Sequence, residues 1–415
     1  MTRKGVWNLQ QVRDKQLKEL WSNEEEVWTC GSNHQGELGI GKREHYAAGQ
    51  NTMIDLSSPV QIIGDNSNWD DISISGSEGY CTVAAKKTDG TLWAWGNGVN
   101  GQLMHTGQNG PDGQRSSPIQ IGSYTNVADF AVAQKSLMWI NTSGELWGAG
   151  YNINGQLGQN DVIDRSSPIQ IPGTTWRSIE GGSNVYLATK TDNTLWGWGY
   201  APYGTLGQNT GWMAGDWHFS SPVQIPGTNW TSTISIGNEH GGAWALRTDG
   251  TLWAMGWGGQ GQLGNNAAIK YSSPIQIPGD WTNCLMSKND SSATNFLITK
   301  SDGTLWTCGN NNYGQLGLGN KTNYSSPIQV PGTYSTSIRP AQGGANGGTS
   351  VAVRSDGTAW GWGVNELGQL GQGSTTPGTE SIGYSQLGSG VTWHSVGLAD
   401  VNFAGIRNTL DSSQE

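Results

Sequence analysis

The sequence predicts an all-β protein: a seven-bladed β-propeller closed by pairing of its N- and C-terminal strands, with a short N-terminal helical arm. The first observation behind this prediction is a sequence unit, a polar glycine turn followed by Leu-Trp, which recurs roughly every 50 residues, a spacing typical of propeller blades. The second is that the two ends of the chain hold complementary parts of one such unit. The repeated tryptophan stands at Trp28, Trp93, Trp147, Trp196, Trp253, Trp306 and Trp360.

The first half of each unit has the pattern of a β-hairpin. In the second copy, residues 80–86 alternate enough to form a strand, and residues 88–91 form a tight turn in which glycine supplies a positive φ. Residues 92–96 form the returning strand. We expect the aspartates of this turn to bond their own backbone rather than to act as acids or bases. They are Asp89, Asp192, Asp249, Asp302 and Asp356.

The second half of the unit adds two more strands. A loop containing Gly-Gln-Leu-Gly leads to a Ser-Ser-Pro strand, residues 116–121 in the second copy, with its proline near the start, where a missing N–H does least harm. The next strand begins at an aromatic residue, and we expect it to be the outermost strand of the blade. The aromatic residues that mark it are Trp69, Tyr124, Trp176, Trp230, Trp281, Tyr334 and Trp393.

Each repeated tryptophan is expected to pack between neighbouring blades, because a four-stranded sheet cannot bury both of its faces alone. Burying one large aromatic side chain contributes about 2–3 kcal/mol, so this set is a large share of a marginal folding free energy. Small residues follow the tryptophan directly, which we interpret as crowding near the propeller axis. They are Ala94, Gly148, Gly197, Ala254 and Gly361.

The chain ends predict how the ring closes. The first copy starts abruptly at Glu26 with the returning strand, and no hairpin strand precedes it. Residues 401–410 supply a strand of the missing type that has no partner of its own. The two pieces together make one blade, in which an N-terminal strand is added to C-terminal strands. A solenoid would instead need polar capping repeats at both ends.

Composition limits the classes of partner. Glycine (64 residues) and tryptophan (22 residues) are far above average usage, and charged residues are only 13% of the chain. The net charge of −10 argues against nucleic acid as a partner, because phosphate binding needs clustered Lys and Arg. The sequence contains no long apolar run, so no membrane insertion is expected. The N-terminus also lacks the apolar stretch of a secretory signal.

No group of residues predicts catalysis, a cofactor or a metal. The histidines show no ligand spacing, and the chain has no Gly-x-Ser-x-Gly nucleophile elbow. The cysteines are expected to be small core residues without disulfides, since Cys30 and Cys308 occupy the same position in different blades. We therefore predict a protein that is not an enzyme. The four cysteines are Cys30, Cys81, Cys284 and Cys308.

The repeated pattern, Thr-Asp-Gly-Thr-Leu-Trp, Gly-Gln-Leu-Gly and Ser-Ser-Pro-Ile-Gln-Ile-Pro-Gly over about residues 28–410, resembles the repeat of the regulator of chromosome condensation family. The resemblance implies a seven-bladed propeller. It does not by itself imply guanine-nucleotide exchange, because proteins of many functions carry this repeat. The histidine that the family places before the hairpin strand is mostly absent here, and only His240 lies close to that position.

The connection between the Gly-Gln-Leu-Gly loop and the Ser-Ser pair differs among copies. The third, fifth and sixth copies use a short form, and the other four carry longer or degenerate stretches at 40–56, 105–115, 208–219 and 372–383. Equivalent connections emerge on one face of a ring, and variable loops on a rigid scaffold commonly carry recognition. Their aromatic residues could instead pack as a lid on their own blade. The candidate partner- or receptor-binding residues are Trp212, Trp217, His218, His45, Tyr46 and His105.

Residues 1–25 are predicted to be a separate attachment arm, and residues 26–415 the propeller. Apolar residues recur at three- and four-residue spacing between charges, as in an amphipathic helix, and Asn8 suits its N-cap. A lone helix of this length is marginal in water, so the apolar stripe must dock, either on the propeller or on another subunit. The candidate docking residues are Trp7, Leu9, Val12, Leu17, Leu20 and Trp21.

The opening Gly5-Val6-Trp7, continued by Leu9, Val12, Leu17 and Trp21, resembles the start of virion and fibre proteins of marine tailed bacteriophages. The resemblance implies an attachment tag and a place in the virion, after assembly in the host cytoplasm. The expected partners are other virion structural proteins through residues 1–25 and a host-surface glycan or protein through the variable loops. The propeller would be a fibre, knob or capsid decoration, and it could be oligomeric. The alternative is an intracellular bacterial protein-interaction scaffold of the same fold.

Overall fold

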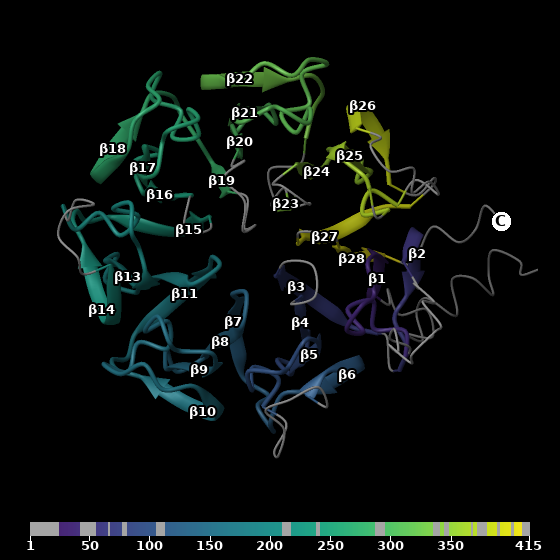
Figure 1. Cartoon of the computed structure of the whole chain (residues 1–415), viewed down its shortest axis with the longest axis vertical. Coiled ribbons are helices and arrows are strands. Elements are labelled where there is room, and N and C mark those ends of the chain that lie inside the picture. The colour runs from purple at the N-terminus through teal and green to yellow at the C-terminus, as the bar shows by residue number, and fades with distance from the viewer. Residues whose placement is uncertain are drawn as a thin grey trace, which may run out of the picture.

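The computed structural model shows seven four-stranded antiparallel sheets arranged as blades around a central axis (Figure 1). This confirms the predicted all-β, seven-bladed propeller. The tryptophan copies give the blades their numbers, so Trp28 lies in blade 1 and Trp360 in blade 7. The structure describes residues 25–41, 55–64, 67–76, 81–104, 113–209, 217–237, 241–286, 295–334, 341–343, 348–366, 368–371, 380–387, 391–399 and 402–408.

Each blade places its strands in one order from the axis outward. Blade 1 consists of β27 (Trp393–Leu398), β28 (Asn402–Asn408), β1 (Glu25–Gly31) and β2 (Leu56–Gln61). Blade 2 consists of β3 (Trp69–Ser75), β4 (Thr82–Lys87), β5 (Leu92–Gly96) and β6 (Arg115–Gln120). Blade 3 consists of β7 (Val127–Val132), β8 (Ser136–Asn141), β9 (Leu146–Gly150) and β10 (Arg165–Ile171). Blade 4 consists of β11 (Trp176–Gly181), β12 (Val185–Lys190), β13 (Leu195–Tyr200) and β14 (His218–Ile225).

The last three blades follow the same scheme. Blade 5 consists of β15 (Trp230–Ile236), β16 (Gly242–Arg247), β17 (Leu252–Gly256) and β18 (Tyr271–Ile277). Blade 6 consists of β19 (Asn283–Met286), β20 (Asn295–Thr299), β21 (Leu305–Gly309) and β22 (Tyr324–Val330). Blade 7 consists of β23 (Ala341–Gly343), β24 (Thr349–Val353), β25 (Ala359–Val364) and β26 (Glu380–Gln386).

The prediction for the outermost strand is wrong. The strand that begins at Trp69 or its equivalents is the innermost strand, and each inner strand contacts the inner strands on both sides around the axis (Figure 1). Trp69 and Trp230 are accordingly fully buried. The Ser-Ser-Pro strand lies at the outer edge, where half-exposed residues dominate, as in β2. Its polar residues and proline suit a solvent-facing edge that must not recruit another strand.

The predicted closure of the ring is confirmed. Strand β1 pairs with β28 along its whole length, and Val27 faces Ile406. Strand β2 adds to the outer side of β1, so the N-terminal part of the chain supplies the two outer strands of blade 1. The C-terminal part supplies the two inner strands, and Phe403 and Ile406 are fully buried. The two ends of the described chain are therefore paired as neighbouring strands of one sheet.

The repeated tryptophan is not the residue that joins the blades, which corrects the prediction. The joining residue stands two positions later and is fully buried at Trp95, Trp198 and Trp362. Each of these indole N–H groups donates 2.8 Å to a loop carbonyl of the preceding blade, on Glu37, Gln156 and Gln315 respectively.

Two of the four free, buried cysteines occupy this joining position. The thiol of Cys308 donates to the carbonyl of Gly261 at 3.2 Å, and the thiol of Cys30 donates to that of Gln369 at 3.8 Å. Burial raises the pKa of both thiols far above its ordinary value. The expectation that all four cysteines are unbridged core residues is confirmed.

Loop contacts, rather than crowding at the axis, explain the small residues after the repeated tryptophan. A Cβ at Gly197 would lie 2.4 Å from Leu206 Cδ2, and one at Gly361 would lie 2.5 Å from Leu370 Cδ2. Both leucines belong to the Gly-Gln-Leu-Gly loop or its equivalent. The first glycine of that loop has a positive φ, and a Cβ at Gly101 would meet Ser166 Cα of the next blade at 2.7 Å. Glycine and serine of the repeat therefore form the contact between neighbouring blades, which we call the seam.

Candidate functional site

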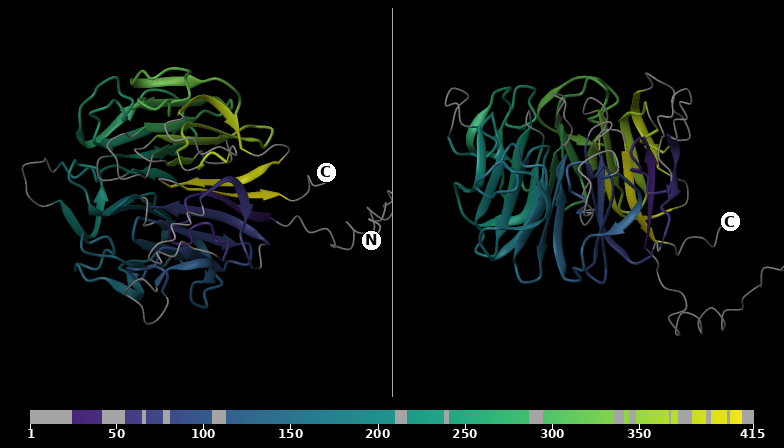
Figure 2. Two further views of the ribbon diagram at one scale, coloured as in Figure 1. Left: turned by 45° about the vertical axis from the view of Figure 1, so that its right-hand side comes forward. Right: turned by 60° about the horizontal axis from the view of Figure 1, so that its bottom comes forward.

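The strands of the seven sheets run between two opposite faces of the ring (Figure 2). We call one the turn face, because the hairpins that join the second and third strands of blades 2 to 7 turn there. We call the other the loop face, because the connections between the third and fourth strands cross it. The strands are antiparallel, so in every copy the third strand ends and the fourth strand begins on the loop face. The short connections of blades 3, 5 and 6 lie there, as predicted.

A cation packed against aromatic rings occupies the turn face in six of the seven blades. Lys190 lies 4.5 Å from the ring centroid of Trp176 and 4.3 Å from that of Trp196. The register explains the arrangement, because Trp176 at the start of β11 pairs with Lys190 at the end of β12. Such contacts contribute about 0.5–2 kcal/mol each, depending on exposure. The equivalent cations are Lys87, Arg247, Lys300, Arg354 and Arg407.

Sequence reasoning missed these cations, although they stand one residue before the Thr-Asp-Gly turn or its variant. Blade 3 has Asn141 at that position, and its side chain donates 2.7 Å to Glu145 instead. Five pairs of aromatic rings on the turn face each contact a cation from their own blade. These positive charges therefore take part in packing within the blade. The repeated tryptophan is thus an architectural residue.

The turn aspartates also serve the architecture, as predicted. The Thr91 hydroxyl donates 2.7 Å to Asp89 Oδ1, and the Thr91 backbone N–H donates to the same atom at 2.9 Å. These two donors lower the pKa of Asp89. The same threonine oxygen accepts the indole N–H of Trp93 at 2.9 Å. The threonine therefore links the turn to the repeated tryptophan, a role that the sequence pattern alone did not reveal.

Replacing Thr91 with valine is expected to lower the free energy of unfolding by about 1 kcal/mol, because the indole loses its acceptor and the aspartate loses a donor. Urea unfolding at neutral pH measures the change. Thr88→Val in the same turn is the matched control, since Thr88 is exposed. Equal stability of the Thr91 variant and the wild type would show that the link is not stabilising.

The loop face presents aromatic residues over three consecutive blades. The residue after the third strand's last glycine is Tyr151 in blade 3, Tyr200 in blade 4 and Trp257 in blade 5, all half-buried. In blades 1, 2, 6 and 7 the same position holds Ser, Asn, Asn and Val. Tyr203 of blade 4 reaches across the seam to Trp257, with ring centroids 5.0 Å apart. Alignment of the copies could have revealed this aromatic arc (Tyr151, Tyr200, Tyr203 and Trp257).

Two of the predicted binding residues join the aromatic arc. His218 is exposed, and its ring lies 4.9 Å from that of Tyr200, its partner in the strand register. Trp217 is half-buried and lies 6.5 Å from Tyr200 in an edge-on contact. The carbonyl of Trp217 accepts the N–H of Ala201 at 2.8 Å. The structure thus brings Trp217 and His218 together on Tyr200.

The other predicted site residues lie outside the described residues. Trp212, His45, Tyr46 and His105 belong to the longer connections of blades 4, 1 and 2. The candidate docking residues of the N-terminal arm, from Trp7 to Trp21, also lie outside them. Their roles remain predictions.

The described part of the chain also carries apolar side chains on the loop-face connections of blades 3 and 5. Ile163 is 60% exposed and Ile269 is 56% exposed, and each stands two residues before the outer strand of its blade. Exposed apolar side chains and aromatic rings are both enriched on surfaces that bind a partner. These two blades flank blade 4, so the apolar residues and the aromatic arc occupy the same three blades.

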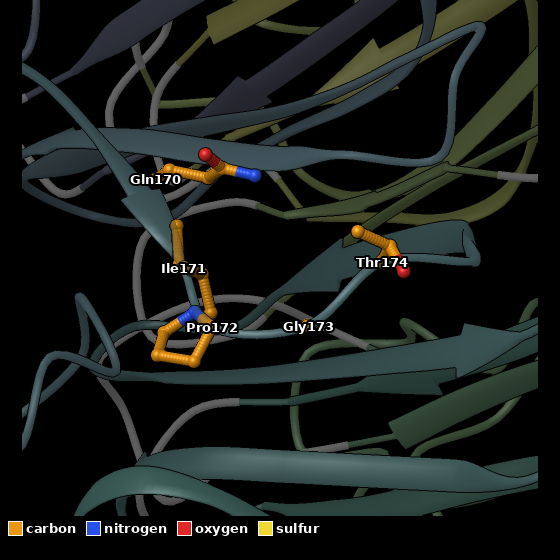
Figure 3. Close-up of a pocket in the computed structure, with 5 residues that line it drawn as sticks. All are labelled: Gln170, Ile171, Pro172, Gly173 and Thr174. Atoms are coloured by element: carbon orange, nitrogen blue, oxygen red, sulfur yellow. The ribbon is translucent and has the colours of Figure 1, made fainter.

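A small hollow lies at the opposite face, on the connection between blades 3 and 4 (Figure 3). It measures about 360 Å³ and is lined by Gln170, Ile171, Pro172, Gly173 and Thr174. A single stretch of chain without ionisable side chains forms it, which does not suit catalysis. Among the described residues, no three His, Cys, Asp or Glu side chains gather as a metal site would require. The same residues include no helix long and apolar enough to cross a membrane.

Three segments of the chain match the Regulator of chromosome condensation (RCC1) repeat: residues 143–188, 249–284 and 302–350. Yeast RCC1 (Prp20), solved bound to Kap60, superimposes with a TM-score of 0.76 over 99% of this chain and 95% of that chain, at 16% identity. Human WBSCR16 gives a TM-score of 0.73 over 93% of this chain and 99% of that one, also at 16% identity. The chain therefore carries RCC1 repeats and folds as an RCC1-like propeller.

Two curated proteins show similarity in sequence. The "Ultraviolet-B receptor UVR8" of Arabidopsis thaliana is 27% identical over 352 residues, which cover 84% of this chain and 75% of that protein. The "E3 ubiquitin-protein ligase HERC2" of Homo sapiens is 26% identical over 385 residues, which cover 88% of this chain but only 7% of that protein. This chain thus corresponds to a small part of HERC2 and to most of UVR8.

Proposed function

We propose that this chain is a binding propeller without enzymatic activity, which holds a partner on the loop face of blades 3 to 5 and is attached to a larger assembly through residues 1–25. We propose further that the assembly is the particle of a tailed bacteriophage. The propeller would then be a fibre, knob or capsid decoration in the virion. One observation carries the proposal: Glu25, where residues 1–25 meet the ring, and the aromatic arc lie on opposite faces of the ring.

The strand register fixes this opposition. Glu25, the first residue of β1, pairs with Asn408, the last residue of β28, so residue 25 lies at the turn face. The chain before residue 25 therefore joins the ring at that face. Tyr200 and His218 lie at the other ends of their strands, on the loop face. An arm that docks at the turn face leaves the loop face directed away from the assembly.

Structures of proteins with this fold support the proposal of a protein partner. The yeast RCC1 (Prp20) structure was solved with Kap60 bound, and a second structure of Prp20p is reported with its binding properties to Gsp1p and histones. Half-buried rings and the exposed Ile163 and Ile269, all on blades 3 to 5, offer the apolar contact area that protein interfaces use. The same rings could stack on a sugar, so a host-surface glycan is the other expected partner. The net charge of −10 disfavours nucleic acid.

Peptide mass spectrometry on gradient-purified virus particles from the source tests the phage setting. Stoichiometric peptides from this chain are expected. Their ratio to the major capsid protein would separate a fibre, present in few copies, from a capsid decoration, present in many. Absence from particles together with abundance in infected-cell lysate would contradict the virion role.

Replacing Trp212 and Trp217 with alanine, alone and with His218→Ala, is expected to weaken binding to host cells at least tenfold. The loss of one or two aromatic anchors typically costs more than 1.4 kcal/mol of binding, or a factor of ten. Thermal unfolding should change little. Asp249→Ala at the turn face is the control, since that exposed carboxylate lies on the opposite side. A large fall in melting temperature with unchanged binding would instead identify these rings as a lid on blade 4.

The second candidate is an intracellular bacterial protein-interaction scaffold of the same fold. The free cysteines favour it, because unbridged thiols are typical of a reducing compartment. The same experiment on particles separates the two functions, since a scaffold would stay in the cell lysate.

A further inference from the structure

In blades 2 and 6 the glutamine of the Gly-Gln-Leu-Gly loop uses both ends of its amide. Its oxygen accepts the backbone N–H two residues earlier, as in Gln102 with Asn100 at 3.0 Å and Gln315 with Tyr313 at 2.9 Å. Its nitrogen donates to the asparagine five residues earlier, from Gln102 to Asn97 at 3.0 Å and from Gln315 to Asn310 at 2.8 Å. In these two blades the position therefore supplies one acceptor and one donor.

Blade 1 has a carboxyl group at this position. Glu37 Oε2 accepts the N–H of Gln35 at 2.7 Å, as the glutamine oxygen does elsewhere. Glu37 Oε1 takes the place of the donating nitrogen, and it is buried without a hydrogen bond. Ser32 occupies the place of Asn97, and its hydroxyl oxygen is also buried without a hydrogen bond. The two side chains are at most 1% exposed.

A third polar side chain joins them from the other end of the chain. Asn402 starts β28 and pairs with Gly31, just as Thr82 starts β4 and pairs with Gly96. In blade 2 the Thr82 hydroxyl lies 3.4 Å from the Gln102 nitrogen. Both side-chain polar atoms of Asn402 are buried without a hydrogen bond. The seam where the chain ends close the ring thus contains three polar side chains with buried atoms that make no hydrogen bond, among them the carbonyl oxygen of Asn402, to which an ionised carboxylate cannot donate.

Burial opposes a charge at this seam. It raises the pKa of Glu37 to about 7, although the two backbone N–H groups it faces and the nearby His34 lower that pKa. Asp55 raises it further. His34 and Asp55 are the titratable groups that act on Glu37 among the described residues. Removing an unpaired carboxylate from water is costly, so such a group takes up a proton instead.

We propose that Glu37 is protonated in the closed ring and imitates glutamine as a hydrogen-bond donor at the seam of blade 1, so that rising pH weakens the closure. The folded ring keeps the proton up to higher pH than the unfolded chain does. Stability from this group is therefore complete at acid pH, falls as pH rises through the interval from the ordinary glutamate range to about 7, and is lost above it.

Urea unfolding of the full chain at pH 5 and pH 8, with and without Glu37→Gln, tests the proposal. The wild type should lose stability relative to the variant over this interval, with a change of about 10²-fold in the ratio of their unfolding constants. His34→Gln controls for histidine titration in the same interval. Because His34 lowers the pKa of Glu37, this variant should keep the loss of stability and shift it toward higher pH. A ratio that stays constant between pH 5 and pH 8 would overturn the proposal.

The reciprocal change gives an independent test in blade 2. Gln102→Glu places a carboxyl at the matching seam and should introduce a second loss of stability on raising the pH. Carbon-13 NMR of labelled glutamate reports the protonation of Glu37 directly, without unfolding. A Glu37 resonance that titrates in the ordinary range of glutamate near pH 4 would contradict the proposal whatever the variants do.

Discussion

Replacing Trp198 with alanine is expected to lower the free energy of unfolding by about 3–5 kcal/mol. The indole is fully buried between blades 3 and 4 and stacks on Tyr186 with ring centroids 6.0 Å apart. Its N–H donates to the carbonyl of Gln156 in the preceding blade. The substitution leaves a cavity and an unpaired carbonyl at the same seam. Both effects act on the contact that holds two blades together.

Urea unfolding followed by circular dichroism measures this loss. Trp198→Phe should cost less, since it keeps most of the buried volume and loses the hydrogen bond. Trp196→Ala is the matched control, because that ring is half-buried and packs on Lys190 at the turn face. If both alanine variants lose the same stability, Trp198 contributes no more to the free energy of unfolding than Trp196 does.

Ending the chain at residue 399 is expected to prevent folding of a stable ring at 25 °C. The truncation removes β28, and with it the buried side chains of Phe403 and Ile406. Burial of each contributes about 1.5–3 kcal/mol, and the lost strand also leaves the backbone groups of β1 and β27 unpaired. The sum is comparable with the whole stability of a typical domain.

Thermal unfolding and size-exclusion chromatography detect the outcome. A circular permutant is the control: residue 408 is linked to residue 25, and new ends are opened in the turn between Asp249 and Gly250. This variant keeps every strand, and Glu25 already pairs with Asn408, so it should fold and melt near the wild type. A truncated chain as stable as the permutant would show that the ring does not depend on its closing strand.

The repeat, the turn aspartates, the buried cysteines and the ring closure could all be predicted from the sequence, because each rests on local patterns that recur. The loop-face position of the variable connections followed from the same periodicity. The N-terminal arm and Trp212, His45, Tyr46 and His105 remain predictions. Alignment of the copies would have marked the position of the aromatic arc, but the contact between Tyr203 and Trp257 forms only when blades 4 and 5 stand side by side.

The sequence by itself determined the blade. Hydrophobic period, turn chemistry and repeat length specify a four-stranded unit and the number of such units in the ring. Which strand faces the axis was decided only by the tertiary structure, since Trp69 and Ser116 mark strands of similar length and either order satisfies the hairpin pattern. The choice depends on contacts between blades, where buried tryptophans and tight glycine seams exclude water. The proposed protonation of Glu37 has the same origin, because burial at a seam shifts its pKa and no local pattern reveals burial.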